Sequence, residues 1–452
     1  MNSKSIFKIR QNYIMHSCKK IFAITISLFM AKGIHAQSLY FPPLTGSAWD
    51  TISPTTLNWC QDKIDSLYTY LDTNNTKAFI LLKDGKIVLE KYFGTQTQNS
   101  VWQWASAGKT LTSFLVGMAQ QEGHLSITDT SSQYLGQGWT SCTPAQEEKI
   151  TIRNQLTMTS GLDDGVPDNH CTYDSCLVYL ADAGTRWAYH NAPYTLLDSV
   201  IFYSTGMTMN AYATQKLKNP TGMTGAFIPI GYDNVYFSNA RSMARFGLLI
   251  LNNGNWNGNQ IMTDTAYFNQ MTNTSQMLNK SYGYLWWLNG KASYMLPGTQ
   301  FVFPGYLNPH APADMIAALG KDGQFLNVIP SENMVWVRMG EAPDSLPVPY
   351  LMNDVIWQYI NDLNCSTGLN EMNEKSPAIQ IFPNPISSEF NLTSDETISK
   401  VEIINLQGQA VTTETVNDKF VKIQNITLPS GFYFVRAYLT NGNVWTGKML
   451  KK

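Results

Sequence analysis

The apolar residues of this 452-residue chain recur with two different periods, which predicts a mixture of helices and strands. Helical spacing appears near both ends of the main domain, at 56–71 and 348–363. Residues 78–94 contain two apolar runs around Asp84-Gly85, a dipeptide typical of a two-residue hairpin turn. The other main-domain segments are short helices over about 124–280 and β-rich runs at 282–290, 315–321 and 325–341.

The order of these elements predicts the fold class and the domain boundaries. The order is a helix, two strands, a long helical segment, further strands and a final helix. This order is typical of an α+β fold with an inserted helical subdomain. We place this domain at 37–366, followed by a polar linker at 367–378. Residues 379–452 contain only short β runs separated by turn residues, which predicts a small all-β, sandwich-like C-terminal domain.

Residues 1–36 have the composition of a secretory signal peptide. They contain six basic residues and no acidic one, and the apolar run from Ile21 to Ala31 is too short to span a bilayer. Cleavage after Ala36 removes six of the 31 basic residues and leaves 25 against 33 acidic ones, a net charge near −8. This charge argues against nucleic-acid binding, and no later segment is a candidate membrane span.

Export permits disulfide bonds among the five cysteines that follow the signal peptide. Cys171 and Cys176 are close enough in sequence to pair across a short loop. Cys60 and Cys365 accompany the two terminal helical patterns and are expected to pair if those helices pack together, which leaves Cys142 over. The chain has no HExxH or CxxC motif and its histidines are scattered, so we expect no metal site and no cofactor.

The segment 102–123 raises the first chemical question, because a lysine stands in the first turn of an amphipathic helical pattern. Ser106 and Lys109 are one turn apart on the same face, and an apolar run from Leu111 to Val116 follows. A helix N-terminus favours anions over cations. The dipole and the apolar surroundings both lower a lysine pKa, which makes the lysine a base for the serine. The alternative is a serine N-cap with a lysine that extends to the surface.

Two further motifs follow. Tyr189-x-Asn191 lies eighty residues after Lys109, between a glycine-containing loop and a helical run. The pentapeptide 320–324, Gly-Lys-Asp-Gly-Gln, lies between two β runs, where its cation and glycine can line a strand edge. Each pattern alone also has a structural explanation, since Tyr-x-Asn recurs elsewhere in the chain and a glycine-rich turn often carries an exposed lysine. The order and spacing of the three motifs along the chain are therefore stronger evidence for an active site than any single motif.

In this order and spacing, the three motifs resemble those of the serine β-lactamase and penicillin-binding protein superfamily, over about residues 45–362. The phrases ITIRNQLTMTSGL, NVYFSNARSMARFGLLIL and YGYLWWL strengthen the resemblance. The chain is similar in particular to the class C-like branch of β-lactamases, D-amino-acid peptidases, esterases and 6-aminohexanoate-dimer hydrolases. The resemblance implies an antiparallel sheet flanked by helices, as in β-lactamases and DD-peptidases. It also implies a secreted serine hydrolase that forms an acyl-enzyme with a small or peptide-like ester or amide.

The resemblance further implies a role for each motif residue. Ser106 is the acylated nucleophile, Lys109 is its partner in proton transfer, and Tyr189 is the general base. Asn191 contacts the substrate amide and the lysine, and Lys321 and Gly323 are the cation and the glycine of the substrate-binding motif. The backbone N–H of Gln324 forms the oxyanion hole together with that of Ser106. A Ser-His-Asp hydrolase is disfavoured because the chain has no G-x-S-x-G motif. The alternative is a penicillin-recognising or peptidoglycan-binding protein with little or no turnover.

The sequence departs from the superfamily pattern at Asp322, which stands where the third motif has a threonine. If Asp322 faces the substrate, its charge repels a substrate carboxylate and favours an ester or amide without one. If it points away, as alternate strand residues do, it carries no information. His190 either tunes Tyr189 or points into the structure. Asp163 and Asp164 are also conspicuous, but a turn with a glycine on each side is enough to explain their presence. Of Trp286 and Trp287, we expect one to lie in the core and the other in a wall of the site.

Residues 379–452 resemble the type A sorting domain of the type IX secretion system. The resemblance rests on FPNP at 382–385, LPSGFYFV at 428–435 and a basic end at Lys448, Lys451 and Lys452. It implies the type IX secretion machinery as a partner and a secreted or cell-surface protein. The alternative is a carbohydrate-binding or adhesive β module.

Overall fold

The structure is a computed structural model that describes residues 39–341, 348–365, 379–406 and 408–452. The predicted signal peptide and the predicted linker lie outside the described residues. Among the described residues, no helix is long and apolar enough to cross a membrane.

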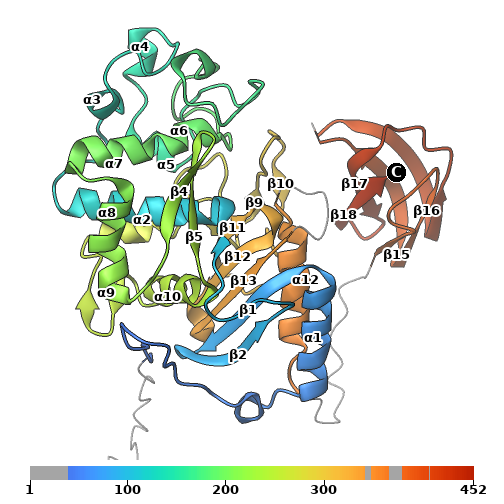
Figure 1. Ribbon diagram of the computed structural model, residues 1–452. Helices are drawn as coiled ribbons and strands as arrows, with labels where there is room; N and C mark the ends of the chain where they lie inside the picture. Colours follow the sequence, from blue (N-terminus) through green and yellow to red (C-terminus); the bar gives the residue numbers. More distant parts are fainter. Residues whose placement is uncertain (1–38, 342–347, 366–378, 407) are drawn as a thin grey trace, which may run out of the picture. The chain divides into compact units, whose positions relative to one another are not determined.

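A six-stranded sheet forms the centre of the main domain, and every neighbouring pair of strands is antiparallel (Figure 1). The order across the sheet is β2-β1-β13-β12-β11-β8, so strands from opposite ends of the domain meet where β1 pairs with β13. The six strands are β1 (Thr76–Lys83), β2 (Lys86–Tyr92), β8 (Trp287–Leu288), β11 (Ile316–Gly320), β12 (Gln324–Ile329) and β13 (Met334–Gly340). This confirms the predicted α+β class with its antiparallel sheet.

The predicted hairpin is confirmed by the β1–β2 turn, where Asp84 has φ 51° and Gly85 has φ 80°. Both turn residues are left-handed, as a two-residue hairpin turn requires. Gly85 has a second constraint, since a Cβ there would lie only 2.0 Å from the backbone oxygen of Tyr40. The turn therefore tolerates only glycine at this position.

Helices cover both faces of the sheet, which explains why every residue of β13 is buried. On one face α10 (Ala240–Leu251) packs closely, and a Cβ on its Gly247 would lie 2.5 Å from Val335. On the other face lie α1 (Gln61–Thr73) and α12 (Tyr350–Asn361) (Figure 1). The two terminal helices pack side by side through the stacked rings of Tyr70 and Tyr359.

Both predicted disulfides are present. Cys60–Cys365 joins the start of α1 to the segment just after the end of α12, and Cys171–Cys176 closes a short loop. Cys142 remains as a free thiol. The first bridge spans 305 residues of sequence, so it fixes the two ends of the domain to each other.

The inserted helical subdomain follows β2 and is confirmed. Its short helices α3 to α7 lie together at one end of the domain, away from the β1–β2 hairpin (Figure 1). The helices between β2 and β11, besides α10, are α2 (Lys109–Gln121), α3 (Ser132–Leu135), α4 (Pro144–Glu147), α5 (Ile152–Leu156), α6 (Asn191–Thr195), α7 (Leu197–Thr205), α8 (Met209–Ala213), α9 (Asn219–Thr221) and α11 (Thr265–Met271). The short strands outside the central sheet in this region are β3 (Trp102–Gln103), β4 (Ala226–Ile230), β5 (Asp233–Ser238), β6 (Asn255–Trp256), β7 (Asn259–Gln260), β9 (Ser293–Tyr294) and β10 (Phe303–Pro304).

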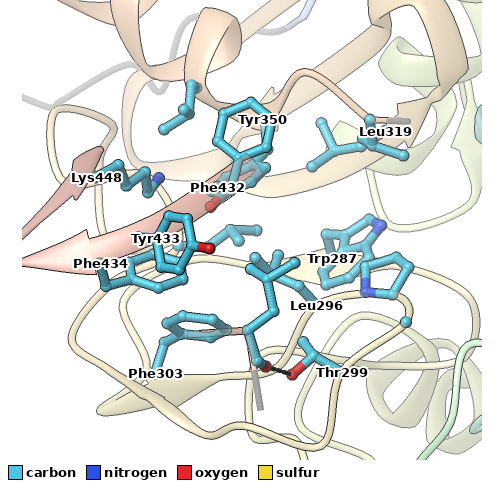
Figure 2. Close-up of a pocket in the computed structure, with 16 residues that line it drawn as sticks. Trp287, Leu296, Thr299, Phe303, Leu319, Tyr350, Phe432, Tyr433, Phe434 and Lys448 are labelled. Atoms are coloured by element: carbon cyan, nitrogen blue, oxygen red, sulfur yellow. Dashed lines mark hydrogen bonds between the residues drawn. The ribbon is translucent and has the colours of Figure 1, made fainter. Parts of the chain in front are cut away.

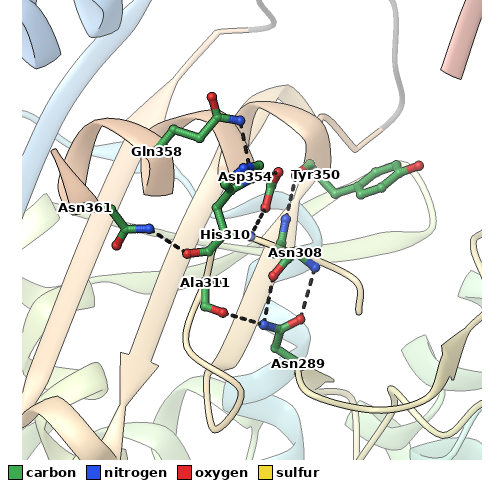
Figure 3. Close-up of polar contacts among 8 residues, drawn as sticks. All are labelled: Asn289, Asn308, His310, Ala311, Tyr350, Asp354, Gln358 and Asn361. Atoms are coloured by element: carbon green, nitrogen blue, oxygen red, sulfur yellow. Dashed lines mark hydrogen bonds and ion pairs between the residues drawn. The ribbon is translucent and has the colours of Figure 1, made fainter. Parts of the chain in front are cut away.

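A polar network holds the loop between β10 and β11 against the end of the sheet and α12 (Figure 3). The Asn289 side chain accepts a hydrogen bond from the backbone N–H of Asn308 at 3.0 Å and donates to its carbonyl oxygen at 2.9 Å. The Asn308 side chain in turn donates to the carbonyl oxygen of Tyr350. His310 pairs with Asp354 of α12 at 2.7 Å. These contacts anchor the segment that leads into β11 and the third motif.

The C-terminal residues form the predicted all-β domain, a five-stranded antiparallel sheet around its own apolar core. The order is β14-β15-β17-β18, with β16 on β15. The strands are β14 (Gln380–Phe382), β15 (Phe390–Ile404), β16 (Ala410–Ile423), β17 (Gly431–Leu439) and β18 (Val444–Lys451).

Candidate active site

Ser106 lies in a single 3₁₀ turn, η2 (Ala105–Gly108), and α2 begins only at Lys109. Lys109 therefore stands in the first turn of the helix, as expected, and Ser106 lies in the 3₁₀ turn directly before it. Ala105, which precedes the serine, has φ 45°, a left-handed conformation that is rare for residues other than glycine. Such strain is typical of functional sites, where the surrounding structure imposes it.

Two hydrogen bonds from Trp104 hold the nucleophile turn in this conformation. The Trp104 backbone N–H donates to the carbonyl oxygen of Tyr236 at 2.8 Å, and its indole N–H donates to the Ser238 hydroxyl at 2.8 Å. Both partners lie on β5, which also pairs with β3 immediately before the turn. The turn is thus fixed from outside by a strand, while Ser106 itself is only half-buried.

Lys109 is buried, with 4 % of its surface exposed, and its Nζ donates a hydrogen bond to Ser106 Oγ at 2.9 Å. The ammonium lies over the rings of Tyr194 and Tyr189, at 4.3 and 5.2 Å from their centroids. Burial lowers the pKa of Lys109 to about 8, although the negative charge of Asp233 acts in the opposite direction. The lysine is therefore a buried amine, and the alternative of a surface lysine is wrong. Tyr194 has no signal in the sequence that separates it from a core tyrosine.

Tyr189 is the second residue at Ser106. Burial raises the pKa of Tyr189 well above its ordinary value, against a hydrogen bond to Ser106 that lowers it. The tyrosine ring stacks on Trp287, with the centroids 6.1 Å apart and the planes at 16°. Trp287 lies near Leu296 and Leu319 among the apolar residues drawn in Figure 2, and none of the seven predicted site residues lines that pocket.

The neighbouring tryptophan and histidine are structural. Trp286 stacks on Phe246 in the core, and Trp287 is also buried but stacks on Tyr189. His190 is buried, and burial lowers the pKa of its imidazole to about 4, so it is neutral at physiological pH. Of the two alternatives for His190, the structure supports the one that points inward. Asp164 forms an ion pair with Arg186 at 2.6 Å.

Asn191 is the first residue of α6, and its side-chain amide points to a loop that sequence reasoning did not include. Its Nδ2 lies 3.1 Å from Asn169 Oδ1 and 3.1 Å from His170 Nε2. His170 Nδ1 in turn pairs with Asp233 at 2.6 Å. Burial raises the pKa of Asp233, but His170, Lys109 and Thr195 outweigh burial and hold it below its ordinary value.

The third motif forms a 3₁₀ turn, η5 (Lys321–Gly323), between β11 and β12. Gly320 packs directly on the nucleophile turn, since a Cβ there would lie 2.5 Å from the backbone oxygen of Trp104. Lys321 is exposed, and Gln324 is fully buried. The Gln324 side chain is hydrogen-bonded to the backbone N–H and carbonyl of Gly340, so this side chain is not available to a ligand.

Asp322 does not lie on a strand, so the alternative that relied on strand alternation does not apply to it. It has φ 62°, and its side chain is half-buried. The backbone of this turn is held by Arg338, a fully buried residue of β13 that the sequence analysis did not single out. Its guanidinium donates to the carbonyl oxygens of Gly323 at 2.7 Å and Asp322 at 3.1 Å.

Comparison with known protein families identifies a family for each of the two domains. Residues 75–359, well over half of the chain, match the family described as Beta-lactamase. The chain belongs to the beta-lactamase family. Residues 380–452 match a second family, the Secretion system C-terminal sorting domain. The beta-lactamase family match contains all seven predicted site residues, and the sorting domain contains none.

Solved structures with a similar fold cover 72 % and 86 % of the chain. A candidate 6-aminohexanoate-dimer hydrolase from Bacillus anthracis superposes with a TM-score of 0.54 and 20 % identity, over 72 % of this chain and 89 % of that one. The octameric penicillin-binding protein homologue from Pyrococcus abyssi gives 0.51 and 13 %, over 86 % and 96 %. In sequence, a candidate penicillin-binding protein, PbpX, of Bacillus subtilis (strain 168) is 27 % identical over 165 residues, 32 % of this chain and 40 % of that protein. These similarities support the beta-lactamase-like fold, and the sorting domain together with the disulfides indicates an exported protein.

The described part of the chain contains no group of three or more His, Cys, Asp or Glu side chains arranged to hold a metal ion. The site consists instead of a serine, an amine, a phenol and an amide. This donor set suits acyl transfer.

Proposed function

We propose that this protein is a secreted serine hydrolase that cleaves an ester or amide through an acyl-enzyme on Ser106. The observation that carries the proposal is the 2.9 Å hydrogen bond between Ser106 Oγ and the buried Nζ of Lys109. A lysine whose pKa is lowered to about 8 is partly neutral at physiological pH, so it can accept the serine proton.

In the proposed acylation step, Ser106 Oγ attacks the substrate carbonyl carbon while its proton passes to the neutral amine of Lys109. The backbone N–H groups of Ser106 and Gln324 stabilise the oxyanion. The tetrahedral intermediate then collapses, the C–O or C–N bond breaks, and the leaving group takes the proton back from Lys109. Water repeats the sequence on the acyl-enzyme and releases the acid.

Tyr189 acts in this scheme as a neutral phenol. Because burial raises its pKa, the hydroxyl keeps its proton at the pH where Lys109 is already partly neutral. We therefore assign the base to Lys109, and assign Tyr189 to relaying the proton from Lys109 to the leaving group. This differs from the role that the family resemblance implied, in which the tyrosine is the base.

The substrate lies, in this proposal, between Asn191 and the η5 turn. We assign Lys321 and Gly323 to the binding of the substrate, and Trp287 supports Tyr189 through their stacked rings. Asp322 next to Lys321 offsets part of its positive charge. We therefore propose an ester or amide without an essential carboxylate, and expect penicillins and cephalosporins to be poor substrates.

The pH dependence of kcat/KM should follow Lys109. The reaction needs the neutral amine, so kcat/KM should rise with pH through an apparent pKa of about 8 and level off above it. The measurement is a pH profile on a neutral ester substrate. The charge of Asp233 raises the lysine pKa, so Asp233→Asn should move this limb to lower pH. A limb that falls as the pH rises through 8 contradicts the assignment of the base.

Turnover separates a hydrolase from a penicillin-recognising or peptidoglycan-binding protein of the same fold. The experiment is a progress curve with a panel of p-nitrophenyl esters and anilides at a measured protein concentration. A hydrolase releases many equivalents of product, and Ser106→Ala releases none above the background. Release that stops at one equivalent supports the binder instead.

We further propose that the sorting domain delivers the protein to the type IX secretion machinery, after export by the signal peptide. The family match at 380–452 supports this step. The site residues all lie outside that domain, so its removal after secretion would leave them in place.

A further inference from the structure

The loop 168–176 lies beside Asn191 and is fixed in three ways. The Cys171–Cys176 disulfide closes it, and Cys171 is buried. The backbone carbonyl of Asn169 accepts a hydrogen bond from the N–H of Ala192 at 2.9 Å, which ties the loop to the first turn of α6. At its tip, Tyr173 packs edge to face on Tyr232 of the β4–β5 turn. The side chains of Asn169 and His170 are therefore held in place beside Asn191.

The close polar contacts of His170 determine which of its nitrogens accepts. Its Nδ1 lies 2.6 Å from a carboxylate oxygen of Asp233, and a carboxylate only accepts, so Nδ1 carries the hydrogen. In the neutral imidazole, Nε2 is then the acceptor. The atom at 3.1 Å from Nε2 is Asn191 Nδ2, which must donate.

The same logic fixes the amide of Asn191. An asparagine Nδ2 has two hydrogens, and here one points to His170 Nε2 and the other to Asn169 Oδ1 at 3.1 Å. Both donors are used inside the protein. Rotating the amide by half a turn would place Oδ1 against two acceptors. The Asn191 side chain is therefore held with its carbonyl oxygen as the group available to a substrate.

We propose that Asn169 and His170 are positioning residues that make Asn191 an acceptor for the N–H of the scissile amide, and so favour amides over esters. This inference rests on the proposed function and names the substrate class of the same site. An amide offers an N–H at the leaving atom and an ester does not, so only the amide gains a hydrogen bond to Asn191 Oδ1. Asp233 contributes indirectly, because it fixes the hydrogen of His170 on Nδ1.

The test is the ratio of kcat/KM for a matched anilide and phenyl ester, both built on the acyl group that the wild-type protein cleaves fastest. His170→Ala should lower the anilide-to-ester ratio at least tenfold, because Asn191 can then rotate. Asn169→Ala should lower it in the same direction and serves as a second, independent variant. In His170→Gln, the side-chain carbonyl can accept from Asn191 while the amide donates to Asp233, so the ratio should stay within threefold of wild type.

His310→Ala is the matched control, since His310 forms the same kind of pair with Asp354 at 2.7 Å but lies on the loop before β11. It should leave the ratio unchanged. An equal loss on both substrates in His170→Ala, or an unchanged ratio, overturns the positioning role while the proposed function stands. A wild-type protein that cleaves neither substrate class overturns the proposed function and this inference with it.

Discussion

Lys109→Met should slow the reaction of Ser106 with an acylating substrate by about 10²- to 10⁴-fold, which is the usual contribution of a positioned base. Methionine fills a similar volume between the rings of Tyr189 and Tyr194, so the packing of the site is kept. What it lacks is the amine that lies 2.9 Å from Ser106 Oγ. The measurement is single-turnover acylation followed by stopped-flow absorbance.

Lys218→Met is the control for this variant. Lys218 is another partly buried lysine whose pKa burial lowers, but its amine donates to the carbonyl oxygen of Gly225. It should acylate at the wild-type rate. Acylation of the Lys109→Met protein at the wild-type rate would show that some other group takes the serine proton. A smaller loss in Tyr189→Phe than in Lys109→Met is also expected, because the tyrosine relays the proton and is not the base.

Arg338→Met should lower the free energy of unfolding of the hydrolase domain by about 3 to 5 kcal/mol. The fully buried guanidinium donates to Thr76 Oγ1 and to the carbonyl oxygens of Asn74, Asp322 and Gly323. Methionine fills the space but leaves these acceptors buried without a donor. The Lys321–Gly323 turn should then lose its fixed conformation, so kcat/KM should fall as well.

Urea denaturation followed by tryptophan fluorescence measures this change, because eleven of the twelve tryptophans precede the sorting domain. Arg338→Lys should fall between wild type and Arg338→Met, since an ammonium keeps the charge but reaches fewer of the carbonyls. Equal midpoints for all three proteins would mean that the turn is held by other contacts.

Local features of the fold were predictable from the sequence. The Asp84-Gly85 turn, the β12–β13 pair and the terminal helices each have a signal within a few residues, namely a turn dipeptide, a run of apolar residues or helical spacing. The Cys60–Cys365 bridge followed from placing those two helices together. The pairing of β1 with β13 is a contact between distant segments, and periodicity alone does not specify such a partner.

The site was predictable as far as its residues lie in short motifs. Ser106 and Lys109 are three residues apart, and a helical turn of either kind brings them together. His170 and Asp233 are 63 residues apart and meet only because the disulfide loop and the β4–β5 hairpin converge. The one signal for this loop was its closely spaced pair of cysteines. Arg338 lies within an apolar strand run, where a charged residue marks a buried hydrogen-bonding role, but nothing in the sequence names its partners.

The most direct test of the central claim is intact-mass spectrometry of the mature protein after incubation with a fluorophosphonate, with Ser106→Ala as the control. This reagent needs an activated serine and no knowledge of the substrate. We expect a single adduct that peptide mapping places on Ser106, no adduct on Ser106→Ala, and slow labelling of Lys109→Met. A folded wild-type protein that forms no adduct, or forms it at another serine, would contradict the account and leave Lys109 a structural lysine.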